Sequence, residues 1–275
     1  MPTVSTNDGV ELRYRVDDFR DPWIGDTDEG ILLHHGLARS MKWWTQWIPA
    51  LARRYKVVRY DCRGCGRSSV PPAGAEWSPQ RLALDALTVA DHVGLRKIHW
   101  IGFESGGIFG IVFATLFPDR ISSLVLVNTP YKFLDELTSL YEQGQASPSE
   151  AIRKLGWREW LTKTMAGRMD LAIADKGLVE WHIEEHSKTP QDVAVAYEHI
   201  VESADVSPLL SKILVPTLIM TGDRSVTCPV EAQLFMQRQI PNARPLVVFP
   251  GIGAGIQLLI PDKCTDEALR FLTTL

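Results

Sequence analysis

The sequence of 275 residues contains no run of about 20 apolar residues, the length that a membrane-spanning helix needs. Its opening residues, Met1–Asp8, also lack the basic and apolar regions of a secretory signal peptide. Glycine and proline are not in excess, at 20 and 17 residues, which excludes collagen-like and low-complexity chains. These absences favour an ordinary globular protein of the cytoplasm without a membrane partner.

Basic charge is scarce as well. Lys and Arg together number 29, against 33 Asp and Glu, which gives a net charge of −4. A nucleic-acid site needs a basic surface that neutralises phosphates, so we expect no nucleic-acid partner. A small-molecule or small-peptide substrate is expected instead, and the sequence does not indicate the oligomeric state.

The cysteines do not follow a metal-binding pattern. Cys62 and Cys65 make a single C-x-x-C, and the other two, Cys228 and Cys264, stand far from it in the chain. A structural zinc site would need a second pair at a suitable spacing. We therefore expect reduced thiols, with Cys62 and Cys65 filling a tight loop, and neither a metal nor a cofactor.

The sequence does contain a regular alternation of short apolar runs and helical segments. The runs are rich in β-branched residues, as is typical of strands buried on both faces of a parallel sheet. They cover residues 31–34, 57–60, 98–101, 124–127, 217–220 and 246–249. A nearly all-apolar segment at 105–117 predicts a helix that is buried on most sides. The pattern predicts an α/β fold with helices on both faces of the sheet.

This alternation stops between residues 131 and 210. Helix starts recur there, with a capping box at Ser147-Pro148-Ser149-Glu150 and a further start at Thr189-Pro190, but no strand of comparable quality appears. We predict an all-helical lid at 131–210, inserted in a core made of residues 1–130 and 211–275. Such a lid would cover the carboxyl ends of the parallel strands, where open α/β sheets bind ligands.

Three motifs follow the first three inner strands. They are His35-Gly36-Leu37, Asp61-Cys62-Arg63-Gly64-Cys65-Gly66-Arg67-Ser68 and Gly102-Phe103-Glu104-Ser105-Gly106-Gly107. Together they resemble the α/β-hydrolase fold superfamily, in particular small lidded members such as enol-lactonases and related esterases. The resemblance implies a mostly parallel sheet with helices on both faces and an all-helical lid. It does not fix the reaction, because this fold carries many chemistries.

The resemblance places a nucleophile in the motif Gly-x-Ser-x-Gly, on a strained turn from strand to helix. Read in register, Gly102 and Gly106 put Glu104 at the position of that serine. Ser105 would fit only after a slip of one residue, which would put Phe103 where the first glycine belongs. By this resemblance Glu104 is the expected catalytic residue.

By the same resemblance, the other positions of the family's triad are changed too. Ser225 stands at the acid position, while Asp223 comes two residues early and suits a turn. The alternative acid position holds Asn128, and Ala254 stands where the family has its late histidine. No histidine follows His199, and a Ser–His–acid triad needs that histidine as its base. We expect a degenerate triad and no ordinary acyl-enzyme.

An oxyanion hole would survive these changes. Its two donors are backbone N–H groups, here those of Leu37 and Ser105, and they do not depend on the side chain. A carboxylate beside them, that of Glu104, is placed to move a proton on or off a bound carbonyl compound. The leading hypothesis is a non-hydrolytic isomerase, epimerase or lyase of biosynthesis, which transfers a proton next to a carbonyl. Its substrate would be medium-sized and apolar or natural-product-like.

Two other functions stay open. Glu104 directs a water molecule if the protein is a hydrolase, and solvent oxygen then enters the product. The second alternative is an inactive pseudoenzyme that binds a ligand or a partner protein. In that case Glu104 only makes a hydrogen bond within a disused site.

Tryptophans gather in two short segments, one after the oxyanion loop and one in the predicted lid. They are Trp43, Trp44, Trp47, Trp157, Trp160 and Trp181. Core packing and the lining of an apolar pocket are both open for them, and the two segments are expected to face each other across the site.

His182 and His186 match the motif H-x-x-E-H, for which we favour a polar lid helix over a metal site. In that position His182 would face the pocket. The residues expected to line the substrate pocket are His35, Arg39, Phe103, Asn128, Trp157, Trp160, His182, Ser225, Ala254 and Ile256.

Overall fold

The computed structural model describes residues 2–134 and 137–275 and shows one sheet of eight strands. The strands are β1 (Thr3–Ser5), β2 (Glu11–Asp17), β3 (Glu29–His34), β4 (Val57–Tyr60), β5 (Lys97–Phe103), β6 (Ile121–Val127), β7 (Thr217–Gly222) and β8 (Val247–Phe249). Their order across the sheet is β1-β2-β4-β3-β5-β6-β7-β8. β2 is antiparallel to both of its neighbours, and the other neighbouring strands are parallel. The sheet is therefore mostly parallel, as the apolar runs predict.

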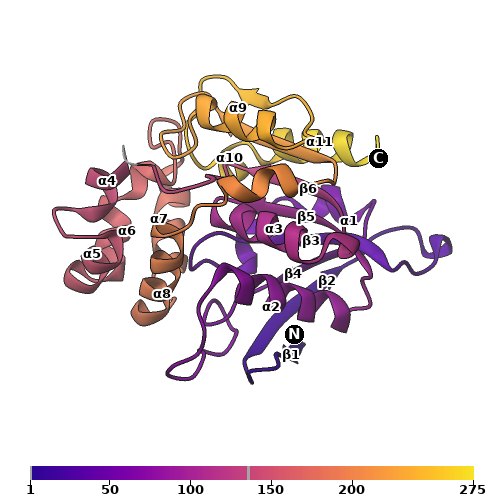
Figure 1. Cartoon of the computed structure of the whole chain (residues 1–275), viewed down its shortest axis with the longest axis horizontal. Helices are drawn as coiled ribbons and strands as arrows, with labels where there is room; N and C mark the ends of the chain where they lie inside the picture. Colours follow the sequence, from indigo (N-terminus) through magenta and orange to yellow (C-terminus); the bar gives the residue numbers. More distant parts are fainter. Residues whose placement is uncertain (1, 135–136) are drawn as a thin grey trace.

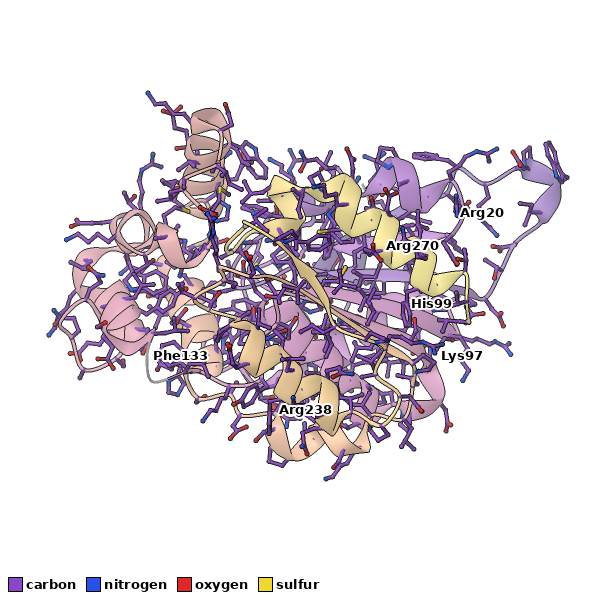
Figure 2. All side chains as sticks on the ribbon, turned by 90° about the horizontal axis from the view of Figure 1, so that it is seen from above. Arg20, Lys97, His99, Phe133, Arg238 and Arg270 are labelled. Atoms are coloured by element: carbon purple, nitrogen blue, oxygen red, sulfur yellow. The ribbon has the colours of Figure 1, made fainter. Side chains whose placement is uncertain are left out.

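Helices cover both faces of the sheet (Figure 1). Outside the segment between β6 and β7 they are α1 (Ile48–Ala52), α2 (Pro79–His92), α3 (Ser105–Leu116), α9 (Val230–Gln239), α10 (Ile256–Leu259) and α11 (Pro261–Leu272). α2, α3 and α9 pack on one face, whereas α1, α10 and α11 pack on the other. Figure 2 shows two exposed side chains, Arg238 of α9 and Arg270 of α11, on opposite sides of the sheet.

The core has two layers because successive residues of a strand point to opposite faces of the sheet. In β3, Leu32 packs with α2 and α3, while its neighbours Ile31 and Leu33 pack with α1 and α11. All three side chains are fully buried. Strands that are apolar on both faces fit only the interior of such a sandwich, which is why they read as continuous apolar runs. The expected fold class, an α/β sheet covered on both faces, is confirmed.

Between β6 and β7 the chain is helical. The helices are α4 (Thr138–Glu142), α5 (Pro148–Leu155), α6 (Trp157–Lys163), α7 (Lys176–His186) and α8 (Gln191–Glu202). The hydroxyl of Ser147 caps α5 by accepting a hydrogen bond from the N–H of Glu150. In the described part of this segment the only β pairing is an isolated bridge between Lys132 and Asp205. We call residues 131–210 the helical insert, and its role as a lid stays a prediction.

The topology brings the carboxyl ends of four parallel strands together. β3, β5, β6 and β7 are neighbours in the sheet and end at His34, Phe103, Val127 and Gly222. The helical insert starts after β6 and contacts the loop that follows β3. Among the described residues, no helix has the length and apolar character that crossing a membrane requires.

Candidate active site at the turn between β5 and α3

The turn between β5 and α3 has a strained backbone at Glu104. Its φ is 50° and its ψ is −125°, a conformation that L-residues with a side chain rarely adopt. A Cβ on Gly102 would lie 2.4 Å from the carbonyl oxygen of Gly106, so the strand and the helix approach this closely only with glycine there. Ser105 is the first residue of the helix. Glu104, and not Ser105, therefore occupies the strained position at the turn.

The Glu104 carboxylate is held from one side by a buried arginine. Arg39 Nη1 lies 2.6 Å from Glu104 Oε2, and the side chain of Arg39 is 0% exposed whereas that of Glu104 is 19% exposed. The Arg39 guanidinium also lies 5.1 Å from the centroid of the Phe103 ring. The second carboxylate oxygen, Oε1, accepts no hydrogen bond from the described residues. One oxygen is thus anchored, and the other is a buried acceptor without a partner among the described residues.

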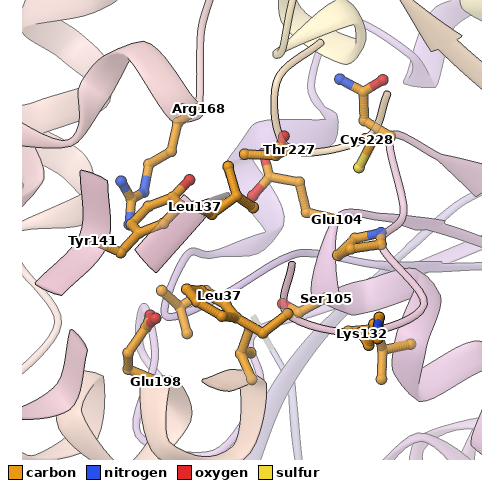
Figure 3. A pocket seen from close by; sticks show the side chains of 16 residues that line it. Leu37, Glu104, Ser105, Lys132, Leu137, Tyr141, Arg168, Glu198, Thr227 and Cys228 are labelled. Atoms are coloured by element: carbon orange, nitrogen blue, oxygen red, sulfur yellow. The ribbon is translucent and has the colours of Figure 1, made fainter. Parts of the chain in front are cut away.

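Glu104 lines a cavity whose wall comes from the core and from the helical insert (Figure 3). The empty space of this cavity is about 620 Å³ with its open mouth included. Beside Glu104 the core contributes Leu37, Ser105 and Asn128. The insert contributes Tyr141, Arg168 and Glu198, and Lys132 lies where the insert begins.

The two candidate oxyanion donors, the amides of Leu37 and Ser105, belong to residues that line this cavity. Neither amide N–H donates a hydrogen bond to another residue in the part of the chain that the structure describes. Backbone donors of this kind stabilise a developing oxyanion by about 3–4 kcal/mol each. Their role as an oxyanion hole stays a prediction.

The loop that carries Leu37 is anchored by the helical insert. His186 of α7 donates from Nε2 to the carbonyl oxygen of Leu37 at 2.7 Å. The hydroxyl of Thr189, between α7 and α8, donates to the carbonyl oxygen of Ala38 at 2.7 Å. Burial, together with the nearby charge of Arg39, lowers the pKa of His186 well below its usual value, so the ring is neutral and Nε2 carries the proton. The insert thus sets the position of a candidate oxyanion donor.

Asn128 stands next to Glu104 at the end of β6. The N–H of Glu104 donates to the carbonyl oxygen of Val127 at 2.9 Å, which joins the two strand ends. Asn128 has a φ of 46°, and its side chain is buried with neither amide atom bonded to a described residue. A buried amide without a partner costs free energy, which a bound molecule would recover by hydrogen bonding.

Several residues expected in the pocket lie behind its wall instead. His35 is in the core, where its Nε2 accepts a hydrogen bond from the N–H of Cys62 at 3.0 Å. Burial and the neighbouring His34 lower the pKa of His35 to about 3, so its ring is neutral. Arg39 and Phe103 stack behind Glu104, and Ile256 is fully buried at the start of α10.

The residues at the positions of the family's acid and histidine, Ser225 and Ala254, are also absent from the cavity wall, although Thr227 and Cys228 of the loop after β7 line it. The hydroxyl of Ser225 accepts a hydrogen bond from the N–H of Cys228 at 3.1 Å. Asp223 accepts one from the N–H of Ile252 at 3.2 Å and so braces the loop that follows β8. Ala254 lies in that loop, is buried, and has no group that transfers a proton.

The tryptophans of the two segments pack against protein rather than line the cavity. Trp43, after β3, and Trp181 of α7 have ring centroids 4.8 Å apart, so the two segments do meet. Trp157 and Trp160 stack within α6 at a centroid distance of 5.5 Å. Both side chains are buried and absent from the cavity wall. They therefore belong to the packing of the insert and do not line the pocket, as the sequence had predicted them to do.

His182 packs outside the cavity as well. Its ring lies edge-on to Trp43 with centroids 5.5 Å apart, and burial lowers its pKa well below the usual value. The second histidine of the motif, His186, bonds to the Leu37 carbonyl. Over residues 2–134 and 137–275 no group of three or more side chains is arranged to hold a metal ion. The helix thus packs against the loop after β3.

Sequence reasoning missed three side chains of the insert that line the cavity, those of Tyr141, Arg168 and Glu198. Figure 3 shows them together on one side of the pocket. Burial raises the pKa of Glu198 to about 7, although the charge of Arg168 opposes the rise. A signal for Glu198 was available, because it follows the buried Ala194 by four residues and so lies on the apolar side of α8.

Comparison with known proteins gives relatives over most of the chain. Residues 30–252 match the family described as alpha/beta hydrolase fold. A Caulobacter segnis protein named "Putative carbamate hydrolase RutD" is 41% identical over 260 residues, which cover 89% of this chain and 91% of that protein. A Pseudomonas savastanoi protein of the same name is 27% identical over 256 residues, which cover 86% and 91%. The crystal structure of the enol-lactonase from Burkholderia xenovorans has a TM-score of 0.85 and 22% identity, covering 99% of this chain and 100% of that one.

These relatives correct the leading functional hypothesis. They are named as hydrolases, so the expectation of a non-hydrolytic isomerase, epimerase or lyase is wrong. That hypothesis rested on a carboxylate placed beside two amide donors. The same arrangement activates a water molecule as readily as it moves a proton on carbon, so the position of Glu104 alone does not separate the two reactions.

Proposed function

Because the chain belongs to the α/β-hydrolase fold family, we propose that it is a hydrolase of small carbonyl compounds of the carbamate, ester or lactone class. The observation that carries the proposal is the carboxylate of Glu104, a residue that lines the cavity. One of its oxygens is anchored by Arg39, and the other is a buried acceptor without a partner among the described residues. The names of the relatives, carbamate hydrolase and enol-lactonase, support this substrate class.

In this mechanism Glu104 is a general base. Its Oε1 accepts a proton from a water molecule, whose oxygen attacks the carbonyl carbon of the substrate. The carbonyl oxygen becomes an oxyanion that accepts hydrogen bonds from the amides of Leu37 and Ser105. When the tetrahedral intermediate collapses, Glu104 returns the proton to the departing oxygen or nitrogen. The products are an acid and an alcohol or amine, and the carboxylate is regenerated.

Arg39 orients the base. Its planar guanidinium is fully buried and donates to Oε2 at 2.6 Å, so rotation of the Glu104 carboxylate would break a charge-assisted hydrogen bond. The strained backbone at Glu104 adds a second restraint, because the turn projects the side chain from the junction of strand and helix. Both restraints favour the general-base geometry over a freely moving surface carboxylate.

Direct attack by water also suits the changed triad positions. Ala254 has no base for a serine nucleophile, and Ser225 has no carboxylate to orient one. An ester formed on Glu104 would likewise find no histidine there to activate water against it. The proposal therefore contains no covalent intermediate.

The test uses Glu104→Gln and a panel of small p-nitrophenyl carbamates and esters in ¹⁸O-labelled water. Wild type is expected to release p-nitrophenol and to place solvent oxygen in the acid product. Glu104→Gln keeps an acceptor for Arg39 but no base, so kcat should fall by about 100-fold or more. Glu159→Gln, which changes an exposed carboxylate on α6, is the matched control and should leave kcat unchanged. Equal kcat values for wild type and Glu104→Gln contradict the proposal.

A fluorophosphonate probe separates this mechanism from serine hydrolysis. The probe labels activated serines, and the Ser105 hydroxyl has no described partner that would deprotonate it. We expect no labelled peptide by mass spectrometry. A label on Ser105 would show that the serine, and not Glu104, carries the reaction.

A further inference from the structure

Arg168 is a buried charge in the cavity wall that the proposed hydrolysis does not use. It follows the short 3-10 helix Met165–Gly167 in the helical insert and is 4% exposed. Its Nη1 donates to the carbonyl oxygen of Thr164 at 2.9 Å and to the Thr164 hydroxyl at 2.5 Å. Both acceptors are neutral, so these bonds hold the guanidinium without balancing its charge.

Two neighbouring aromatic rings contact this guanidinium. Its central carbon lies 4.4 Å from the ring centroid of Trp160 and 5.0 Å from that of Tyr141. The Trp160 ring is held in place as well, because its indole N–H donates to the backbone carbonyl oxygen of Tyr141 at 2.7 Å. A Cβ on Gly167 would lie 2.3 Å from the Tyr141 hydroxyl, so the backbone also packs tightly here. Arg168 is therefore a preorganised group rather than a flexible surface arginine.

The charges that face the cavity do not balance Arg168. The Glu104 carboxylate is already paired with Arg39. Burial raises the pKa of Glu198 to about 7, so part of the population is uncharged at neutral pH. Over residues 2–134 and 137–275, Arg168 forms no salt bridge, and the half-buried Lys132 adds a further positive charge to the wall. A buried cation without an anionic partner is costly and binds a carboxylate favourably when one is supplied.

We propose that Arg168 binds a carboxylate of the substrate, so that the enzyme acts on small acidic esters or carbamates. This proposal rests on the hydrolase function above and names its substrate class. Nε and Nη2 donate to no described residue, which leaves the fork geometry that suits a carboxylate. Figure 3 shows Arg168 on the insert side of the pocket and Glu104 across from it. The substrate spans the cavity, with its carboxylate at Arg168 and its scissile carbonyl at Glu104.

The lining between these ends favours a short apolar linker. Leu37, Ile108 and Leu137 line the cavity together with the two charged groups. A chain of a few methylene groups would contact these side chains and separate the carboxylate from the carbonyl. The half-ester of glutaric acid with p-nitrophenol has this form, and its methyl ester has the same shape without the charge.

The first experiment compares kcat/KM for mono-p-nitrophenyl glutarate and for methyl p-nitrophenyl glutarate. Wild type should prefer the acid by about tenfold or more, which corresponds to one charge-assisted contact. Arg168→Met keeps much of the packing against the rings and should reduce the ratio to about one, mainly through KM. Arg158→Met is the matched control, because Arg158 is exposed and paired with Glu184 on the surface, and its ratio should equal that of wild type. A wild-type ratio near one overturns the proposal, whether or not the variants fold.

The second experiment measures binding without turnover. Isothermal calorimetry with glutarate and with neutral glutaramide is carried out on wild type, Arg168→Met and the charge-retaining Arg168→Lys. Glutarate should bind wild type at least about tenfold more tightly than glutaramide, and Arg168→Met should lose this difference. Arg168-dependent binding of glutarate without hydrolysis of either ester would retain the carboxylate site and refute the hydrolase function. Hydrolysis of both esters at equal rates, with no preference for glutarate in binding, would retain the function and refute the site.

Discussion

Gly102 is the residue on which the geometry of the turn at Glu104 depends most directly. A Cβ there would lie 2.4 Å from the carbonyl oxygen of Gly106 and 2.7 Å from the nitrogen of Gly107, and these backbone atoms move only if α3 moves. Gly102→Ala should therefore lower the free energy of unfolding by about 2–3 kcal/mol. Gly177→Ala, in the first turn of α7, meets only the end of the Asp175 side chain and should stay within about 1 kcal/mol of wild type. Equal urea midpoints for the two variants would contradict the close approach.

Arg39 and Glu104 should be energetically coupled. Glu104→Gln leaves the buried guanidinium without a charged partner, and Arg39→Met leaves the carboxylate without its donor. The double variant removes both charges, so it should be more stable than the sum of the single losses implies, by about 1–3 kcal/mol. Urea denaturation of all four proteins measures this coupling. Additive losses would show that the contact contributes nothing beyond its separate parts.

For single residues, the sequence predicts the position in the fold better than it predicts the side chain with which the residue interacts. The glycine spacing places Glu104 at the turn because close packing of strand and helix leaves a local signature. The sequence predicts Arg39 as a pocket residue, yet it lies behind Glu104 and anchors it. The two residues are 65 positions apart in the chain, so only the tertiary fold shows which side of the carboxylate the guanidinium approaches.

Among the elements, the turn between α7 and α8 anchors the loop that carries Leu37. Thr189→Val removes the donor to the Ala38 carbonyl and should lower the free energy of unfolding by about 1–3 kcal/mol. If the loop provides an oxyanion donor, kcat should fall as well while KM changes little, because the contact matters most in the transition state. The measurement is steady-state kinetics together with urea denaturation.

Thr162→Val is the matched control for this anchor. Thr162 makes a hydrogen bond of the same kind, from its hydroxyl to the carbonyl of Arg158, but within one exposed helix. Neither kcat nor the urea midpoint should change appreciably. A Thr189→Val protein that loses stability but keeps kcat would assign the anchor to folding alone.

The elements of the core were more predictable than the inward faces of the insert. Strands such as β3 are apolar on both faces, and α3 is apolar nearly all round, so their composition alone predicts that they are buried. The helices of the insert were expected from their caps, but amphipathicity does not tell what an inner face meets. The sequence therefore does not predict Glu198 as a pocket residue, although it lies on the apolar side of α8. It predicts Trp157 and Trp160 in the pocket, which they do not line.

For the whole molecule, the site is a product of topology. Strand order brings the ends of β3, β5 and β6 together, and the insert returns over them with Arg168 and Glu198. The core and the insert each contribute part of the cavity wall. The motifs of the core therefore predict Glu104 and the two amide donors, but not the charged side chains of the insert. The reaction type was mispredicted for a separate reason, because a carboxylate beside two amide donors suits hydrolysis as well as proton transfer on carbon.

The stability of the whole molecule should carry the pH signature of Glu198. Burial raises its pKa in the folded protein from an ordinary value of 4.5 to about 7, against the charge of Arg168 and with a smaller rise from Glu202. Between these two pH values the folded protein holds a proton that the unfolded chain has released. The free energy of unfolding therefore falls as the pH rises through this window and levels off above about pH 7. For one group the full effect is about 3 kcal/mol.

Glu198→Gln isolates this contribution, because the amide is neutral at every pH. Urea denaturation of wild type and variant is measured at pH 5, 6, 7 and 8. The free energy of unfolding of the variant, relative to that of wild type, should increase with rising pH and reach a plateau above about pH 7. Glu180→Gln changes an exposed carboxylate on α7 and should keep a constant difference from wild type over this range. A constant difference for Glu198→Gln as well would mean that Glu198 is ionised in the folded protein throughout. Arg168 would then be neutralised from within the chain, and the carboxylate site proposed for it would lose its electrostatic basis.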